Sequence, residues 1–167
     1  MTGATLLYLD TQFAFAYLVR EDVDHEAACA LAARLADHHR RGRAEAVVSI
    51  LTLTELSWAL AGALYDRRHG TGAWRNTDRQ HSFVGLRREV AAITRDFLNE
   101  NWVRPVDASA ADCYGIPDHL ISYRLSPADL AHLLIATSAG AQAIISNDRH
   151  FRRLENAPLE IISYGLR

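Results

Sequence analysis

The sequence contains no lysine, and all 18 of its Lys+Arg residues are arginines. This absence excludes enzymes that use a lysine nucleophile or a Schiff-base lysine, because no other side chain supplies that amine. It also excludes a P-loop nucleotide site, whose GK[ST] motif needs its lysine to contact the phosphates. Composition alone therefore removes several large enzyme classes.

Cysteine is also scarce. The two cysteines, Cys29 and Cys113, form no CxxC motif and cannot build a disulfide framework, so we expect a reduced, cytoplasmic protein. No apolar run approaches the roughly 18 residues of a membrane span, and no basic region followed by a signal core opens the sequence. We therefore expect no association with a membrane.

The net charge is only −2, and 23% of the residues are charged. A protein that binds nucleic acid by charge alone is expected to be strongly basic, so the near-neutral balance argues against that class. It does not exclude an enzyme that handles nucleic acid through bound metal ions.

Short apolar segments alternate with helical patterns along the 167 residues. We predict strands at Thr5–Leu9, Ala46–Ile50, Trp102–Val106, Ala143–Ser146 and Leu159–Ser163. Between them we predict helices at Phe13–Arg20, from Asp24 to Gly42, at Thr52–Tyr65, Val84–Trp102, about Ala108–Tyr123 and Ser126–Ala139. This alternation predicts an α/β fold with a parallel sheet that is covered on both faces. We expect one domain over residues 1–167, with residues 66–82 as an arginine-rich loop or helical insert.

Four acidic residues fall at equivalent places in this alternation. Asp10 and Asp148 each come at the end of a predicted strand, in YLDTQF and IISNDRHF. Glu55 and Asp129 lie in the first turn of predicted helices, in LTLTELSWAL and SPADLAHLLIA. Ligands of an open parallel sheet bind beyond the carboxyl ends of its strands, so the four carboxylates are expected to converge there.

Each of these acids also has a purely structural explanation. Thr52 and Glu55 have the spacing of a capping box, as do Ser126 and Asp129, while an aspartate after a strand is a common N-cap. Taken together, however, four like charges at one edge of a sheet would repel unless a cation neutralised them. Oxygen ligands without cysteine or paired histidine select Mg²⁺ or Mn²⁺ over zinc, so we predict a divalent-metal site.

The segments YLDTQF, LTLTEL, SPADLAHLLIATSAG and IISNDRHF resemble, in order and spacing, the acidic motifs of PIN-domain ribonucleases, above all the VapC-type toxins of type II toxin–antitoxin systems. The resemblance implies a PIN-like, Rossmann-like three-layer α/β/α fold whose central, mostly parallel sheet has about 4–5 strands. It makes Asp10, Glu55, Asp129 and Asp148 the metal-holding acids and matches Thr11 and Ser146 to hydroxyl positions of the family. Gln12, where the family often has Asn or Ser, and the long segment 66–82 depart from the pattern.

The implied activity is an Mg²⁺- or Mn²⁺-dependent endoribonuclease that hydrolyses RNA with a metal-activated water. Asp10, Asp129 and Asp148 would hold the ions, and Glu55 would complete the metal shell or accept a proton from the water. Hydrolysis by an external water leaves a 5′-phosphate and a 3′-hydroxyl. By resemblance, the partners are an RNA substrate, a small cognate antitoxin and a second copy in a homodimer.

Four further residues have weaker claims to a role. Trp74, Arg75 and Arg79 lie in an arginine-rich stretch that is interpreted either as RNA-binding or as a solvated helix face with a loop. His132, three residues after Asp129, would touch a phosphate, donate to a carboxylate, or bond a backbone group at the edge of a buried helix. We expect no function of His150, despite its place beside Asp148.

Other functions remain as alternatives. The first strand also resembles that of haloacid-dehalogenase-type phosphatases, but Gln12 stands where these need a second acid and their catalytic lysine is absent. A catalytically silent PIN-like module that binds RNA or protein is a different class, against which the four retained acids argue. A housekeeping PIN-type RNA-processing nuclease keeps the chemistry without the toxin role.

Overall fold

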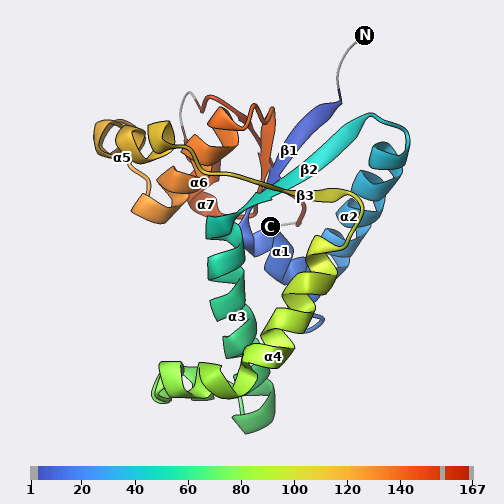
Figure 1. Cartoon of the computed structure of the whole chain (residues 1–167), viewed down its shortest axis with the longest axis vertical. Coiled ribbons are helices and arrows are strands. Elements are labelled where there is room, and N and C mark those ends of the chain that lie inside the picture. The colour runs from blue at the N-terminus through green and yellow to red at the C-terminus, as the bar shows by residue number, and fades with distance from the viewer. Residues whose placement is uncertain (1–3, 155–156, 166–167) are drawn as a thin grey trace.

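A computed structural model describes residues 4–154 and 157–165 of the chain. Within this part, five parallel strands form one sheet in the order β3-β2-β1-β4-β5 (Figure 1). The strands are β1 (Thr5–Leu9), β2 (Ala44–Ser49), β3 (Val103–Val106), β4 (Ala143–Ile145) and β5 (Glu160–Ile162). The predicted parallel sheet is confirmed, and its strand boundaries shift by only one or two residues.

Helices cover both faces of the sheet. They are α1 (Thr11–Leu18), α2 (His25–Arg40), α3 (Ile50–His69), α4 (Arg79–Leu98), α5 (Ala110–Tyr123), α6 (Pro127–Ser138) and α7 (Arg149–Arg152). In Figure 1, α5, α6 and α7 lie on one side of the sheet and α1 and α2 on the other, which confirms the three-layer α/β/α arrangement. No helix in residues 4–154 and 157–165 is both long and apolar enough to span a membrane.

The central strand β1 is buried on both faces. Leu7 and Leu9 pack into the core beneath α1, α2, α3 and α4, whereas Tyr8 points into the core formed with α6 and α7. A strand that is covered on both faces needs apolar residues at every position, which explains the uninterrupted run TLLYL. The polar hydroxyl of Tyr8 is the exception, and it extends toward the carboxyl edge of the sheet, where it contacts the residues that begin α3.

The start of α3 differs from the prediction. The N-cap is Ser49, whose Oγ accepts a hydrogen bond from the amide of Thr52 at 3.4 Å, so Thr52 already lies inside the helix. Glu55 is therefore in the second turn, and the predicted Thr52–Glu55 capping box is wrong. Because the helix begins earlier, the Glu55 carboxylate is not needed for capping and is available to the edge of the sheet.

Residues 66–82 are largely helical, which was one of the two predicted possibilities, rather than an extended loop. They comprise the end of α3, the short 3₁₀ helix η1 (Ala73–Asn76) and the start of α4, at the tip of a hairpin that projects away from the sheet (Figure 1). Trp74 folds back onto α3, where a Cβ on Gly62 would lie 3.0 Å from its ring. Glycine at position 62 is thus what allows the tip to close against the helix.

The Ser49 cap predicts a measurable cost of mutation. Ser49→Ala removes the N-cap of α3 and a 2.6 Å contact with the buried Tyr8 hydroxyl, so we expect a loss of about 1–3 kcal/mol in the free energy of unfolding in urea. Thr54→Ala on the same helix removes an exposed hydroxyl bonded to the Ile50 carbonyl, and should change stability by less than about 0.5 kcal/mol. Equal losses in the two variants would contradict this role of Ser49.

Candidate active site

The register of the sheet brings the first polar residues after β1 and β4 together. Leu9 pairs with Ile145, so Asp10 and Ser146 follow at the same edge. The Ser146 hydroxyl donates a hydrogen bond to Asp10 Oδ2, and it accepts one from the amide of Asp148 at 2.9 Å. Ser146, which is fully buried, thereby fixes two of the predicted acids relative to each other.

Two of the acids, Asp10 and Asp148, cap helices, as their structural explanation proposed, whereas at Asp129 the cap of α6 is Ser126. Asp10 Oδ1 accepts from the Gln12 amide at 3.2 Å, and Asp148 Oδ1 accepts from the His150 amide at 2.7 Å. Asp129 accepts a bond from the hydroxyl of Ser126, the N-cap of α6, at 2.8 Å. Capping and convergence are not exclusive, because a cap occupies one carboxylate oxygen while orienting the other. Gln12 Nε2, for example, donates to the second oxygen of Asp148 at 3.1 Å.

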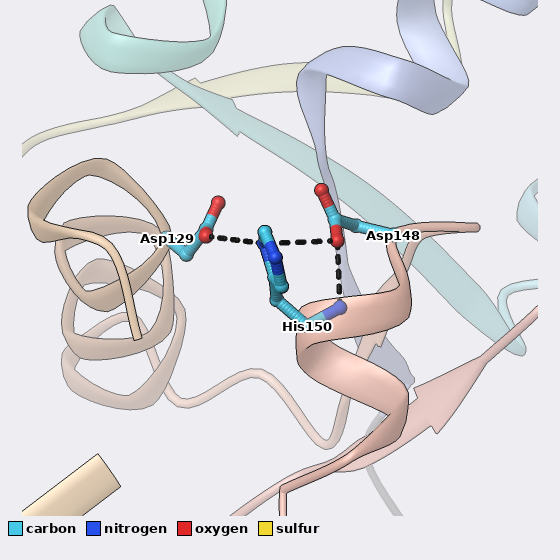
Figure 2. Close-up of side chains that lie close together, drawn as sticks. All are labelled: Asp129, Asp148 and His150. Atoms are coloured by element: carbon cyan, nitrogen blue, oxygen red, sulfur yellow. Dashed lines mark hydrogen bonds and ion pairs between the residues drawn. The ribbon is translucent and has the colours of Figure 1, made fainter. Parts of the chain in front are cut away.

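His150 lies between the carboxylates of Asp129 and Asp148 (Figure 2). Its Nδ1 is 3.3 Å from Asp129 Oδ2 and 3.3 Å from Asp148 Oδ1. One ligand atom from each of these three residues falls within 4.8 Å of the others, a spacing suited to a metal ion. We expected no function of His150 from the sequence, and its place between two of the predicted acids is seen only in the structure. Its position two residues after Asp148 could have indicated this contact, because Asp148 is the N-cap of α7 and accepts a hydrogen bond from the His150 amide.

Glu55 approaches the same edge from α3. Its Oε2 accepts hydrogen bonds from the Thr11 hydroxyl at 2.7 Å and from His132 Nε2 at 3.0 Å. The other ring nitrogen of His132 lies 2.8 Å from the Tyr8 hydroxyl, and because a carboxylate can only accept, Nε2 carries the proton in this pair. Thr11 and His132 thus hold Glu55 from α1 and α6.

His132 is not placed to touch RNA, because its side chain is 2% exposed. Its two partners are the side chains of Tyr8 and Glu55. The expected backbone partner and the predicted RNA contact are therefore both wrong, whereas donation to a carboxylate, the third possibility, is what the structure shows. The His132 ring therefore orients the Glu55 carboxylate.

Burial and the neighbouring charges shift the pKa values of these groups. Burial raises the pKa of Asp10 above its usual range, and the nearby Asp148 carboxylate raises it further against the opposing effects of His132, Ser146 and Gln12. The hydrogen bond from His132 lowers the pKa of Glu55, with a further contribution from Thr11. Burial raises the pKa of Tyr8 to about 12, so its hydroxyl stays protonated. The site therefore holds one acid, Asp10, whose ionised form is disfavoured by burial, and one acid, Glu55, whose ionised form is favoured by hydrogen bonds.

These residues fit a divalent cation. Burial, at 5% exposure, and the neighbouring Asp148 carboxylate both raise the pKa of Asp10. A cation at this edge would offset both effects, because it favours the ionised carboxylate. The carboxylate oxygens match Mg²⁺ or Mn²⁺. Among the described residues, Asp129, Asp148 and His150 have the spacing to hold an ion, and Asp10 lies at the same edge of the sheet.

The predicted RNA contacts Trp74, Arg75 and Arg79 are not brought to this edge. They follow the far end of α3, a helix of 20 residues with a length of about 30 Å, whereas the acids lie near its start. Trp74 packs against Trp58 and Tyr65, which makes it part of the hairpin tip. Arg75 and Arg79 are exposed there.

A three-layer parallel α/β fold with acids gathered at the carboxyl edge defines a recognisable class of domain. The family model of the PIN domain matches residues 7–157, and the chain belongs to this family. No curated protein matches it.

Two solved structures share the fold. One is VapBC2 from Rickettsia felis bound to a DNA fragment from its promoter, at a TM-score of 0.61 and 14% identity, covering 96% of this chain and 100% of the other. The second is VapC20 from Mycobacterium tuberculosis, a sarcin-ricin loop cleaving toxin, at a TM-score of 0.56 and 19% identity, covering 89% of this chain and 96% of the other. At these identities the similarity concerns the fold.

The buried charge of Asp10 predicts a stabilising substitution. In EDTA at pH 7, Asp10→Asn should raise the melting temperature by about 2–4 °C, because the amide keeps the bond from Gln12 and removes the ionisation penalty. Because the pKa of Asp10 is raised in the folded state, the wild type bears the full ionisation penalty above that pKa and none of it below the usual value of 3.8. The melting temperatures of the wild type and the variant should therefore converge in acid. A lower melting temperature of the variant at pH 7 would contradict the assignment.

The restraint on Glu55 predicts a shift of its titration. Replacing His132 with Gln should raise the pKa of Glu55 followed by ¹³C NMR, and Thr11→Ala should raise it less. Because the pKa of Glu55 is lowered in the folded state, its ionised carboxylate stabilises the fold above the usual value of 4.5. This stabilisation is lost as the pH falls through the folded-state pKa. The wild-type advantage over the His132 variant should therefore shrink in acid. An unchanged Glu55 pKa would show that His132 does not act through this bond.

Proposed function

We propose that the protein is an Mg²⁺- or Mn²⁺-dependent endoribonuclease and the toxin of a toxin–antitoxin pair. The observation that carries this proposal is the gathering of Asp129, Asp148 and His150 within 4.8 Å at the edge that also holds the buried Asp10, on a PIN fold. A bound divalent cation would lower the pKa of a water and offset charge on the phosphoryl oxygens.

The protein's own groups orient the reaction. The Ser146 hydroxyl and the Gln12 amide group hold Asp10 and Asp148 in fixed rotamers. Glu55 is the group suited to accept a proton from the attacking water, because its lowered pKa keeps it ionised and the bonds from Thr11 and His132 both end on Oε2. The water oxygen bonds to phosphorus as the bond to the 3′ oxygen breaks. The products are a 5′-phosphate and a 3′-hydroxyl.

His150 has a separate part in this proposal. Its ring contacts Asp129 and Asp148 and lies between their like charges. Because 48% of its side chain is exposed, the ring is free to leave the space between the carboxylates or to bind an ion with them.

The partners remain part of the proposal. The solved VapBC2 is a complex with a DNA fragment from its promoter, and VapC20 cleaves the sarcin-ricin loop, as their names state. By analogy we propose an RNA substrate, a cognate antitoxin, a homodimer and a cytoplasmic location for this chain, within a single domain. Contacts of Trp74, Arg75 and Arg79 with RNA remain predictions.

Cleavage should depend on both metal and acids. With total RNA and Mn²⁺ or Mg²⁺, we expect fragments with 5′-phosphates, no cleavage in EDTA, and a loss of at least about 100-fold in rate for Asp129→Asn. Asp118→Asn, an exposed aspartate on the adjacent α5, is the matched control and should cleave at the wild-type rate. Full activity of Asp129→Asn would end the metal-site proposal.

Expression in cells separates the remaining alternatives. Growth arrest that a small neighbouring gene product relieves would favour the toxin, and cleavage without arrest would favour a housekeeping nuclease. RNA binding without metal-dependent cleavage would identify a silent PIN-like module.

A further inference from the structure

A hollow of about 560 Å³ adjoins the acidic site. It is lined by Ser122, Tyr123, Arg124, His150, Arg153 and Leu154. His150 belongs to both places, because the same residue contacts the carboxylates of Asp129 and Asp148. Anything bound in the hollow therefore lies beside the site where the scissile phosphate would be held.

Two arginines, Arg124 and Arg153, line the hollow. Arg124 follows α5 and Arg153 follows α7, so two segments far apart in the sequence supply one guanidinium each. Both residues are exposed, and over residues 4–154 and 157–165 no carboxylate forms an ion pair with either. Two neighbouring guanidiniums without a protein partner are suited to a phosphate, which they contact through paired N–H groups.

The backbone at Arg124 is unusual. Its φ is 51°, and in the described part of the chain it is the only residue other than glycine with a positive φ. This position after a helix normally takes glycine or asparagine, because a Cβ is unfavourable there. The residue that stands there is a long cation at the wall of the hollow, which suggests that the side chain has a use that outweighs the backbone cost.

A second hollow, of about 410 Å³, also borders His150. It contains Arg149 and Arg152 but also the carboxylates of Asp24 and Asp148. These acids would repel a phosphate, whereas none of the described residues that line the first hollow is acidic. The two hollows therefore differ in charge, and an RNA strand would find its favourable path on the Arg124 side.

The geometry points to this hollow as the subsite for the RNA backbone phosphate next to the one that is cleaved, bound by Arg124 and Arg153. This inference rests on the proposed ribonuclease function and adds the residues that position the substrate. Because they contact the backbone and not the bases, the two arginines would act on RNA of any sequence.

Binding in EDTA tests the subsite without cleavage. The probe is a 5′-fluorescein-labelled single-stranded oligouridylate of 12 nucleotides, followed by fluorescence anisotropy between 50 and 200 mM salt. For Arg124→Ala with Arg153→Ala we expect Kd to rise by about tenfold and the slope of log K against log salt to fall by about 0.7 for the one phosphate lost. Arg40→Ala with Arg41→Ala removes the same charge at the end of α2 and should leave the slope unchanged. Equal slopes in all three proteins would overturn the inference.

Two single variants separate binding from folding. Arg124→Gly should be more stable than Arg124→Ala in thermal unfolding, because it relieves the positive φ, and yet it should bind the oligouridylate equally weakly. Arg124→Lys keeps the charge without the paired N–H geometry and should fall between alanine and wild type. Wild-type affinity in Arg124→Gly would overturn the role of the guanidinium.

Cleavage kinetics locate the phosphate. With an RNA carrying one cut site, the double alanine variant should raise KM and largely retain kcat. An uncharged methylphosphonate linkage next to the cleaved bond should slow the wild type but not this variant, and equal slowing of both would overturn the inference. Absence of cleavage by the wild type, with the difference in salt slope intact, would instead overturn the proposed activity and leave phosphate binding in the hollow supported.

Discussion

The acidic edge of the sheet depends on one constraint, which is that Asp10 directly follows the central strand of a sheet covered on both faces. With neighbours on both sides and 5% exposure, its carboxylate cannot reach bulk water and must be satisfied by the protein or by a cation. Ser146 and the amide of Gln12 supply two hydrogen bonds, but neither carries a charge. These bonds therefore compensate the charge of Asp10 only in part.

A second feature joins the layers around this centre. The Tyr8 hydroxyl, from β1, contacts Ser49 at the start of α3 and His132 on α6, and His132 in turn bonds Glu55. Within the sheet's carboxyl edge, this chain of buried polar groups fixes α3 and α6 relative to the strand between them. The same contacts that cap α3 thus also orient a candidate catalytic acid, so stability and function share these residues.

Charge is distributed unevenly around the site, although the net charge of the chain is only −2. Acids converge at the edge of the sheet, while Arg124 and Arg153 flank them without protein partners in the described structure. A near-neutral average therefore conceals a cluster of acids with exposed arginines beside it. For the proposed RNA substrate both parts would be needed, because the acids alone would repel its phosphates.

The sequence by itself determined the parallel α/β fold and the placement of Asp10, Asp129 and Asp148, because alternating apolar segments fix the strands and strand ends share one edge. The tertiary structure decided the contacts between distant residues, which spacing along the chain does not predict. The register set Asp10 beside Ser146, the early start of α3 freed Glu55 from capping, and His132 turned inward. Likewise, His150 and Arg124 acquired neighbours from distant segments, since contacts between helices depend on packing that local patterns do not encode.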